Sequence, residues 1–154
     1  MSERYFAYGS NLWIDQMVKR TGSIDREDGW PRRAALADFR LTFNMRGDDG
    51  QVFANIESAH SHVLGVVYRC TSKALRIMDN YECGYERRRV IVVFCDGERL
   101  EATTYVAEQT HLTSTGTPDA DYVQRIVRGA RQHGIPETYI REIEREALRH
   151  KVTR

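Results

Sequence analysis

The chain has 154 residues, of which 41% are hydrophobic and 29% are charged. This length and composition favour one soluble globular domain over residues 1–154, with enough apolar side chains for a core that needs neither disulfides nor metal. The 23 basic and 22 acidic residues nearly cancel, so the charge gives no reason to expect nucleic acid or a membrane as a partner.

The cysteine pattern and the lack of a predicted signal region indicate in which cellular compartment the protein is expected. The three cysteines, Cys70, Cys83 and Cys95, form no CxxC pair, which argues against a zinc site or a disulfide framework. Such cysteines are typical of a reducing environment. The sequence shows no signal region and no long apolar span, so we expect a cytoplasmic protein.

The predicted elements, taken in chain order, begin with a strand at 4–8, a short polar turn and a helix at 12–20. Next come strands at 35–44, 52–56 and 63–70, a helix at 71–82, strands at 88–95 and 99–107, and helices at 119–133 and 136–150. Many consecutive strands with peripheral helices predict an α+β fold. A strongly curved or barrel-like antiparallel sheet is the expected architecture.

The first candidate site is the polar turn in the stretch RYFAYGSNLW, residues 4–13. A helix that begins directly after a strand leaves backbone N–H groups unpaired, and its dipole adds partial positive charge there. Gly9 allows a close approach because it has no Cβ, and Ser10 and Asn11 add polar contacts. The turn could therefore hold a carboxylate or a developing oxyanion. A plain helix cap explains the same residues equally well, and no nucleotide-binding motif is present.

The second candidate site lies in LRIMDNYECGYERRRV, residues 75–90. On a helix that starts at Thr71, four residues share one face: Leu75, Met78, Asp79 and Glu82. A carboxylate on a core-facing stripe has its pKa raised by burial, which suits a general acid or base near neutral pH. Two alternatives remain open. The helix could end before Glu82 and leave a solvated acid, or the arginines at 87–89 could neutralise it.

Other residues carry weaker signals. Ser10 could act as a nucleophile, but no GxSxG motif surrounds it. His60 and His62 lie in a predicted loop, where an HxH pair could bind a metal but is more often inert. Three tyrosines are most simply interpreted as packing residues: Tyr85, Tyr122 and Tyr139.

The two candidate stretches resemble motifs of a known family. YFAYGSNL and IMDNYECGYERRRV are similar to segments of the γ-glutamylcyclotransferase family, also called AIG2-like. DFRLTFN, FANI and VLGVVYRC follow in the family's order between them. TPDADYVQRIVRGARQHGIPETYI resembles the family's C-terminal helix and its Gly-Pro turn. The resemblance covers residues 4 to about 143.

The resemblance implies a closed or partly open β-barrel, antiparallel or mixed, with flanking helices. It also implies an enzyme without metal or cofactor whose partner is a small γ-glutamyl substrate. In this family the substrate's own α-amine attacks its γ-carbonyl and releases 5-oxoproline with a free amino acid or amine.

The family's functional residues match positions of this chain. Its glutamate matches Glu82, as general acid and base, and we interpret Asp79 as a supporting residue. The family's glycine loop and a tyrosine match the residues expected to hold the substrate: Tyr5, Phe6, Ala7, Tyr8, Gly9, Ser10, Asn11, Leu12 and Tyr122.

The chain also departs from the family pattern. Cys83 stands where a glycine commonly follows the glutamate, and FANI lacks the glycine and proline that often precede it. These changes leave the shape of the loops and the identity of the leaving amine open. Two other functions remain as alternatives, namely a non-catalytic small-molecule binder on the same fold and a hydrolase that uses Ser10. The sequence predicts no oligomeric state.

Overall fold

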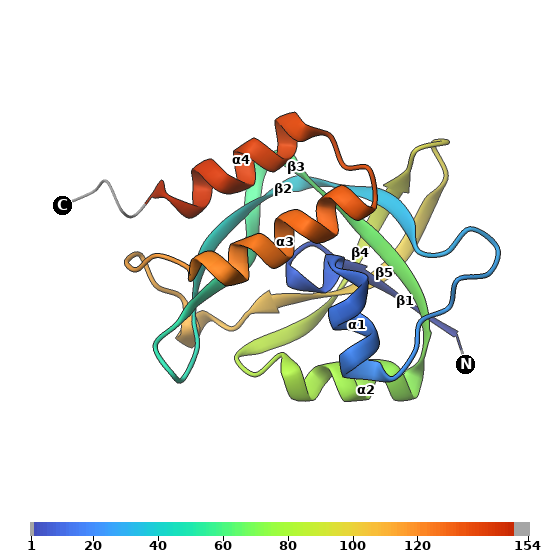
Figure 1. The fold of residues 1–154 in the computed structure, drawn as a ribbon, viewed down its shortest axis with the longest axis horizontal. Coiled ribbons are helices and arrows are strands. Elements are labelled where there is room, and N and C mark those ends of the chain that lie inside the picture. The colour runs from blue at the N-terminus through green and yellow to red at the C-terminus, as the bar shows by residue number, and fades with distance from the viewer. Residues whose placement is uncertain (1, 150–154) are drawn as a thin grey trace.

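The computed structural model describes residues 2–149, whose five strands form a closed barrel (Figure 1). The strands are β1 (Ser2–Ala7), β2 (Arg32–Arg46), β3 (Val52–Thr71), β4 (Tyr85–Phe94) and β5 (Arg99–Ala107). They follow one another around the barrel in the order β1-β3-β2-β4-β5. All neighbours are antiparallel except β5 and β1, which pair in parallel at Tyr5 and Thr103 and close the barrel. The structure confirms the predicted α+β barrel, in its mixed form.

The two longest strands, β2 and β3, bend the sheet into this shape. They pair along nearly their whole length, with register shifts between Ala37 and Phe39 and between Thr42 and Met45. Such bulges increase the local bend and twist of a strand. The hairpin of β2 and β3 pairs with β4 only near Ala34 and Ala35, and the pairing of β2 with β3 continues from there to Arg46 and Val52.

The prediction of two separate strands at 52–56 and 63–70 was wrong, because both belong to β3. Residues 57–62 of β3 are partly or fully exposed and remain part of the strand. At the register shift, residues 59–61 of β3 lie opposite Asp38 of β2, so a bulge and not a loop joins the two predicted segments. His60 and His62 are exposed on β3 instead of lying in a loop. Among residues 2–149, no three His, Cys, Asp or Glu side chains gather into a group that could hold a metal ion.

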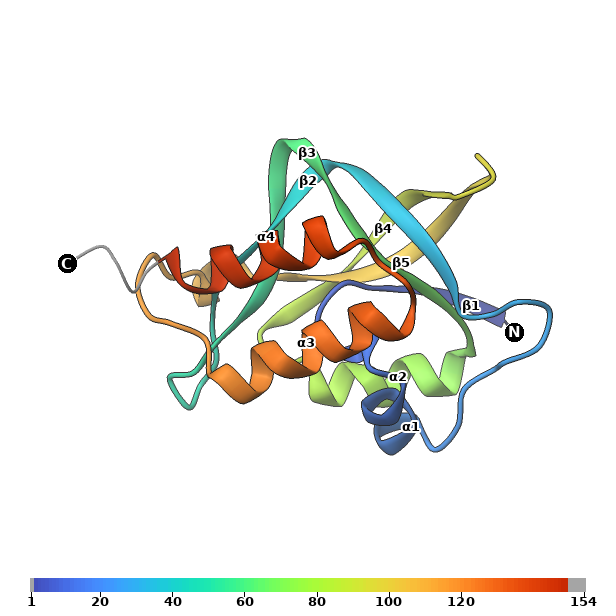
Figure 2. The same ribbon diagram turned by 45° about the horizontal axis from the view of Figure 1, so that its top comes forward.

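The helices flank the barrel in two pairs. The short 3-10 helices are η1 (Ser10–Leu12) and η2 (Gln109–His111), and the α-helices are α1 (Ile14–Thr21), α2 (Ser72–Tyr81), α3 (Ala120–Gln132) and α4 (Glu137–Ala147). Helix α1 packs against α2, and α3 lies beside α4, as both ribbon views show (Figure 2). The last residue of the helix predicted at 136–150 lies outside the described range. No helix of residues 2–149 has the length and apolar character needed to cross a membrane.

Helix α3 holds the first turn in place by direct backbone contact. A Cβ on Gly129 would lie 2.2 Å from the backbone nitrogen of Trp13, so only glycine lets the helix come this close. The ring Nε2 of His133 lies 2.7 Å from the carbonyl oxygen of Leu12, and the Ile14 N–H donates to the side-chain oxygen of Gln132 at 3.0 Å. The turn that ends β1 is therefore fixed from outside the barrel.

Candidate active site

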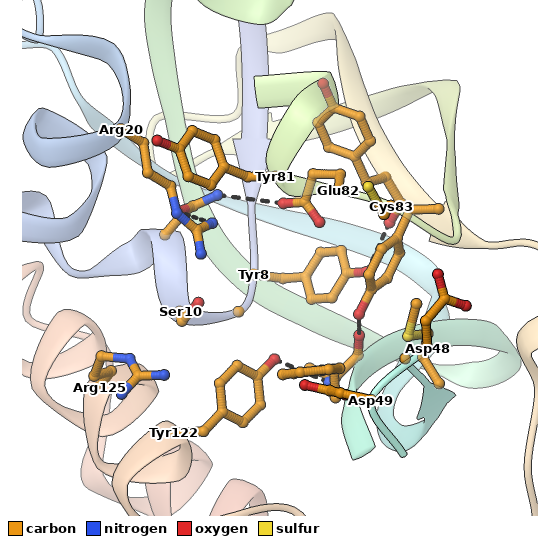
Figure 3. Close-up of a pocket in the computed structure, with 18 of the residues that line it drawn as sticks. Tyr8, Ser10, Arg20, Asp48, Asp49, Tyr81, Glu82, Cys83, Tyr122 and Arg125 are labelled. Carbon is orange, nitrogen blue, oxygen red and sulfur yellow. Dashed lines mark hydrogen bonds between the residues drawn. The ribbon is translucent and has the colours of Figure 1, made fainter. Parts of the chain in front are cut away.

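The site is a cavity of about 400 Å³ between the first turn, the end of α2, the β2–β3 hairpin and α3 (Figure 3). Both candidate segments from the sequence contribute to it, because Glu82 and the turn Gly9–Asn11 line the same space. The other lining residues are Tyr5, Tyr8, Arg20, Met45, Gly47, Asp48, Asp49, Phe53, Ala54, Tyr81, Cys83, Tyr85, Tyr105, Tyr122 and Arg125.

Glu82 directly follows the last residue of α2, and its side chain points into the cavity (Figure 3). Its N–H still donates to the carbonyls of Met78 and Asp79, at 3.1 and 3.2 Å, so the backbone is held by the helix end. Loss of surrounding water raises the pKa of the Glu82 carboxyl to about 7, with a smaller opposing effect from Arg20 and a further increase from Asp79. The Glu82 side chain is partly buried and accepts a hydrogen bond from Asn11 at 3.4 Å, so it differs from the fully solvated acid of the first alternative.

Asp79 differs from Glu82, although both were predicted on one buried face. Its carboxylate accepts two hydrogen bonds from Arg87, at 2.9 and 2.8 Å, and one from the Tyr105 hydroxyl at 2.6 Å. Burial alone would raise the Asp79 pKa, but these hydrogen bonds outweigh it and lower the pKa. The prediction of a buried Asp79 was wrong, since 43% of its side chain is exposed. Arg87 thus pairs with Asp79 and leaves Glu82 without that neutralising partner.

The first turn offers free donors but not the predicted cap. Helix α1 begins after Trp13, and neither Ser10 nor Asn11 caps it with a side chain. The hydrogen bonds of η1 start with the Leu12 N–H, which donates to the Gly9 carbonyl at 3.0 Å. The N–H groups of the three preceding residues, Gly9 to Asn11, have no acceptor within residues 2–149. These amides are available to an anionic group in the cavity.

Asn11 connects the turn to Glu82. Its amide nitrogen donates to the Tyr5 hydroxyl at 2.9 Å and to Oε1 of Glu82 at 3.4 Å. Its amide oxygen accepts from Gln16 and Arg20, at 2.9 and 3.0 Å. Asn11 is only 3% exposed, and these bonds use both ends of its amide. A buried amide satisfied in this way fixes the position of the side chains around it.

Three of the residues expected to hold the substrate lie outside the cavity lining. Phe6, Ala7 and Leu12 are buried in the core, with 0, 1 and 0% of their surface exposed. Phe6 points to the opposite face of β1 from Tyr5, because side chains alternate along a strand. Ala7 pairs with Val66 in the ladder, and Leu12 packs beneath α3. The match to the family's loop could not separate lining residues from core residues.

Tyr122 combines the two roles that the sequence left open. Its ring packs edge-on against Phe53 and Phe43, with centroids 5.1 and 6.4 Å apart. Its hydroxyl accepts the N–H of Ala54 at 2.9 Å and lies 3.7 Å from where a Cβ of Gly9 would be. Tyr85 was predicted only to pack, but it also lines the cavity and donates to the Ala54 carbonyl.

Several charged residues that line the cavity were not predicted from the sequence. Arg125 follows Tyr122 by three positions on α3, a spacing that puts both on one helix face, so the sequence did carry a signal for it. Arg20 faces the site from the last turn of α1. Asp48 and Asp49 belong to the β2–β3 hairpin turn, and only the folding of that hairpin brings them to the cavity.

The chemistry of the cavity follows from these contacts. A carboxylate with a pKa near 7 can accept a proton and return it at neutral pH. Free backbone N–H groups from Gly9 to Asn11 can stabilise negative charge nearby. The cavity therefore brings together a carboxyl group with a raised pKa and a turn whose N–H groups have no acceptor within residues 2–149.

Comparison with known proteins identifies the family. A model of the AIG2-like family matches residues 62–143, which include Glu82 and Tyr122. The chain belongs to the AIG2-like family. No curated protein sequence matches it significantly.

Solved structures similar to this AIG2-like chain share its fold. A protein named "Gamma-glutamyl cyclotransferase" has a TM-score of 0.82 and 26% identity, over 94% of this chain and 87% of that one. An uncharacterized protein from Homo sapiens has a TM-score of 0.81 and 27% identity, over 93% of this chain and 86% of that one. YkqA from Bacillus subtilis has a TM-score of 0.79 and 24% identity, over 95% of this chain but only 54% of YkqA.

Proposed function

We propose that this chain is a γ-glutamyl cyclotransferase that releases 5-oxoproline and a free amino acid or amine from a small γ-glutamyl substrate. The observation that carries the proposal is that Glu82, with its pKa raised to about 7, lines the same cavity as the turn Gly9–Asn11, whose backbone N–H groups have no acceptor within residues 2–149. Membership of the AIG2-like family and the similarity to a protein named as a γ-glutamyl cyclotransferase support it.

The reaction needs a base because the substrate's α-ammonium is protonated at neutral pH and cannot attack. In this proposal Glu82 takes a proton from the ammonium, and the free amine then attacks the γ-carbonyl carbon. The carbonyl oxygen becomes negative and accepts hydrogen bonds from the turn. The protonated Glu82 gives its proton to the leaving nitrogen as the bond from the γ-carbon to that nitrogen breaks. The ionised Glu82 then accepts the second proton of the ring nitrogen, which leaves the neutral lactam, and passes this proton to the departing amine, which leaves as its ammonium form. No water is consumed, and no protein nucleophile or cofactor takes part.

The cavity also supplies orientation. A γ-glutamyl chain must fold back on itself before its amine can reach its γ-carbonyl, and holding it in that conformation can contribute much of the rate enhancement. The fixed turn and the satisfied Asn11 amide are suited to this task, because they are held by α3 and by β1.

The Ser10 hydrolase alternative has no support in the contacts of Ser10. Its hydroxyl accepts a hydrogen bond from the side-chain amide of Gln16 at 2.7 Å. No histidine or carboxylate within residues 2–149 makes a hydrogen bond with that hydroxyl. A serine without such a base is a weak nucleophile.

Product analysis tests the proposal against both alternatives. Incubation with γ-glutamyl dipeptides and γ-glutamylamines should give 5-oxoproline, without ¹⁸O from labelled water in any product, as read by mass spectrometry. Ser10→Ala should keep turnover within about tenfold of the wild-type chain, because its hydroxyl takes no part in bond formation. Labelled glutamate, or loss of turnover in Ser10→Ala, would instead support the hydrolase. Binding without any product would support the non-catalytic binder.

A further inference from the structure

Arg125 is a cation of the cavity that the reaction, as proposed, does not use. It lies in the first half of α3 and lines the same space as Glu82 and the turn (Figure 3). Its guanidinium lies over the Tyr122 ring, 5.7 Å from the centroid. Among residues 2–149, no carboxylate oxygen comes within 4 Å of it, and its buried Nε has no hydrogen-bond partner.

The second cation of the cavity, Arg20, has a different setting. Arg20 donates to the Asn11 side chain at 3.0 Å and stacks over Tyr81 at 4.7 Å. Arg20 is the cation that lowers the pKa of Glu82, and both arginines act on Tyr122. Arg20 thus stands beside the base, and Arg125 stands at the opposite wall, near Ser10 and Tyr122 (Figure 3).

The geometry of a γ-glutamyl compound assigns these two cations to different ends of the substrate. The α-carboxylate shares its carbon with the amine that Glu82 deprotonates, so it must lie close to Glu82 and therefore to Arg20. The leaving group departs from the γ-carbon, at the other end of the glutamyl chain. Resting on the proposed function, we propose that Arg125 binds a carboxylate of the leaving group, so that the chain prefers γ-glutamyl amino acids to γ-glutamylamines.

The chemistry of arginine fits this role. A planar guanidinium matches a carboxylate with two parallel hydrogen bonds, and stacking over an aromatic ring holds its plane fixed. An unpaired cation next to apolar rings also costs stability, and a substrate carboxylate would relieve that cost. An alkylamine leaving group offers nothing to Arg125 and would leave it unpaired.

A matched pair of substrates tests the assignment. γ-Glutamyl-alanine and γ-glutamyl-ethylamide differ only in the carboxylate of the leaving group. For the wild-type chain, kcat/KM should be about 10- to 100-fold higher for the first, which is the usual range for one charge-assisted hydrogen-bonded pair. Arg125→Gln should remove that advantage and leave the ethylamide within about twofold, and Arg125→Lys should restore part of it.

Arg128→Gln is the control on the same helix, because Arg128 is exposed and stacks on Trp13 outside the cavity. It should change neither substrate. Equal losses on both substrates in Arg125→Gln, no loss on either, or a wild-type preference for the ethylamide would overturn the assignment. If neither compound yields 5-oxoproline, the proposed function fails, and calorimetry then decides on Arg125 separately. In calorimetry γ-glutamyl-alanine should bind more weakly to Arg125→Gln than to the wild-type chain, whereas γ-glutamyl-ethylamide should bind equally to both chains. Equal affinity of γ-glutamyl-alanine for the two chains would overturn the role of Arg125.

Discussion

Replacing Glu82 by glutamine is expected to lower kcat about 10²- to 10⁴-fold while making the protein more stable above pH 7. The loss of rate follows from the loss of a cavity carboxyl group whose pKa of about 7 suits proton transfer at neutral pH, since positioned acids and bases contribute factors of this size. Initial rates of 5-oxoproline release measure it. Retention of wild-type turnover would remove Glu82 from the reaction.

The gain in stability has a definite sign and pH range. Burial raises the pKa of Glu82 from 4.5 to about 7, so the folded chain binds a proton that the unfolded chain has already lost between these values. Stability therefore falls as the pH rises from about 4.5 to 7, and it stays lower above 7. Glutamine carries no charge to bury, and its oxygen can still accept from Asn11.

The free energy of unfolding of Glu82→Gln should thus exceed that of the wild-type chain by on the order of 1–3 kcal/mol at pH 8. At pH 4 the two chains should be nearly equal. Urea unfolding at both pH values measures this difference. The control is Glu86→Gln, because Glu86 is an exposed carboxylate on β4 outside the cavity; it should change neither rate nor stability. A Glu82→Gln variant that is less stable at pH 8 would contradict the burial of the charge.

Replacing Asn11 by alanine is expected to impair both the site and the fold. The change removes the hydrogen bonds that join Asn11 to Tyr5, Glu82, Gln16 and Arg20. It leaves partly buried polar groups without partners, which costs about 1–3 kcal/mol of stability. It also removes a donor to the ionised Glu82 and releases Arg20, whose charge lowers the Glu82 pKa.

The loss of the Asn11 donor and the release of Arg20 should both raise the pKa of Glu82 in Asn11→Ala. The rising limb of kcat/KM against pH should therefore shift to higher pH, and the rate at pH 7 should fall by about tenfold or more. Asn80→Ala, on the exposed side of α2, is the matched control and should behave as the wild-type chain. A fall in rate at every pH without a shifted limb would show that Asn11 acts on the fold alone.

Much of the barrel could be predicted because its strands carry strong local patterns. The segments that became β1, β2, β4 and β5 were each found from apolar and β-branched residues, and the helix at 71–82 from its cap at Thr71 and its apolar stripe. The sequence could not show that 52–56 and 63–70 are one strand. That depends on the bulge between Ser58 and His62, which only the pairing of β3 with β2 creates.

The candidate site was predictable where one segment alone determines it. The turn at Gly9–Asn11 and the acid at Glu82 each had a local signal, and the structure places them on one cavity. The different surroundings of Asp79 and Glu82 were not predictable, because the sequence does not show which of the two carboxylates Arg87 on β4 contacts in the folded chain. Arg20, Asp48 and Asp49 were missed for the same reason: distant segments bring them to the cavity.

Titration of the Glu82 carboxyl carbon by ¹³C NMR, assigned by comparison with Glu82→Gln, tests the account most directly. A desolvated acid held opposite the amides of the first turn should titrate with a midpoint of about 7. A midpoint near the ordinary value of about 4.5 would mean that water surrounds the carboxylate, and the proposed role of Glu82 as the base would be contradicted.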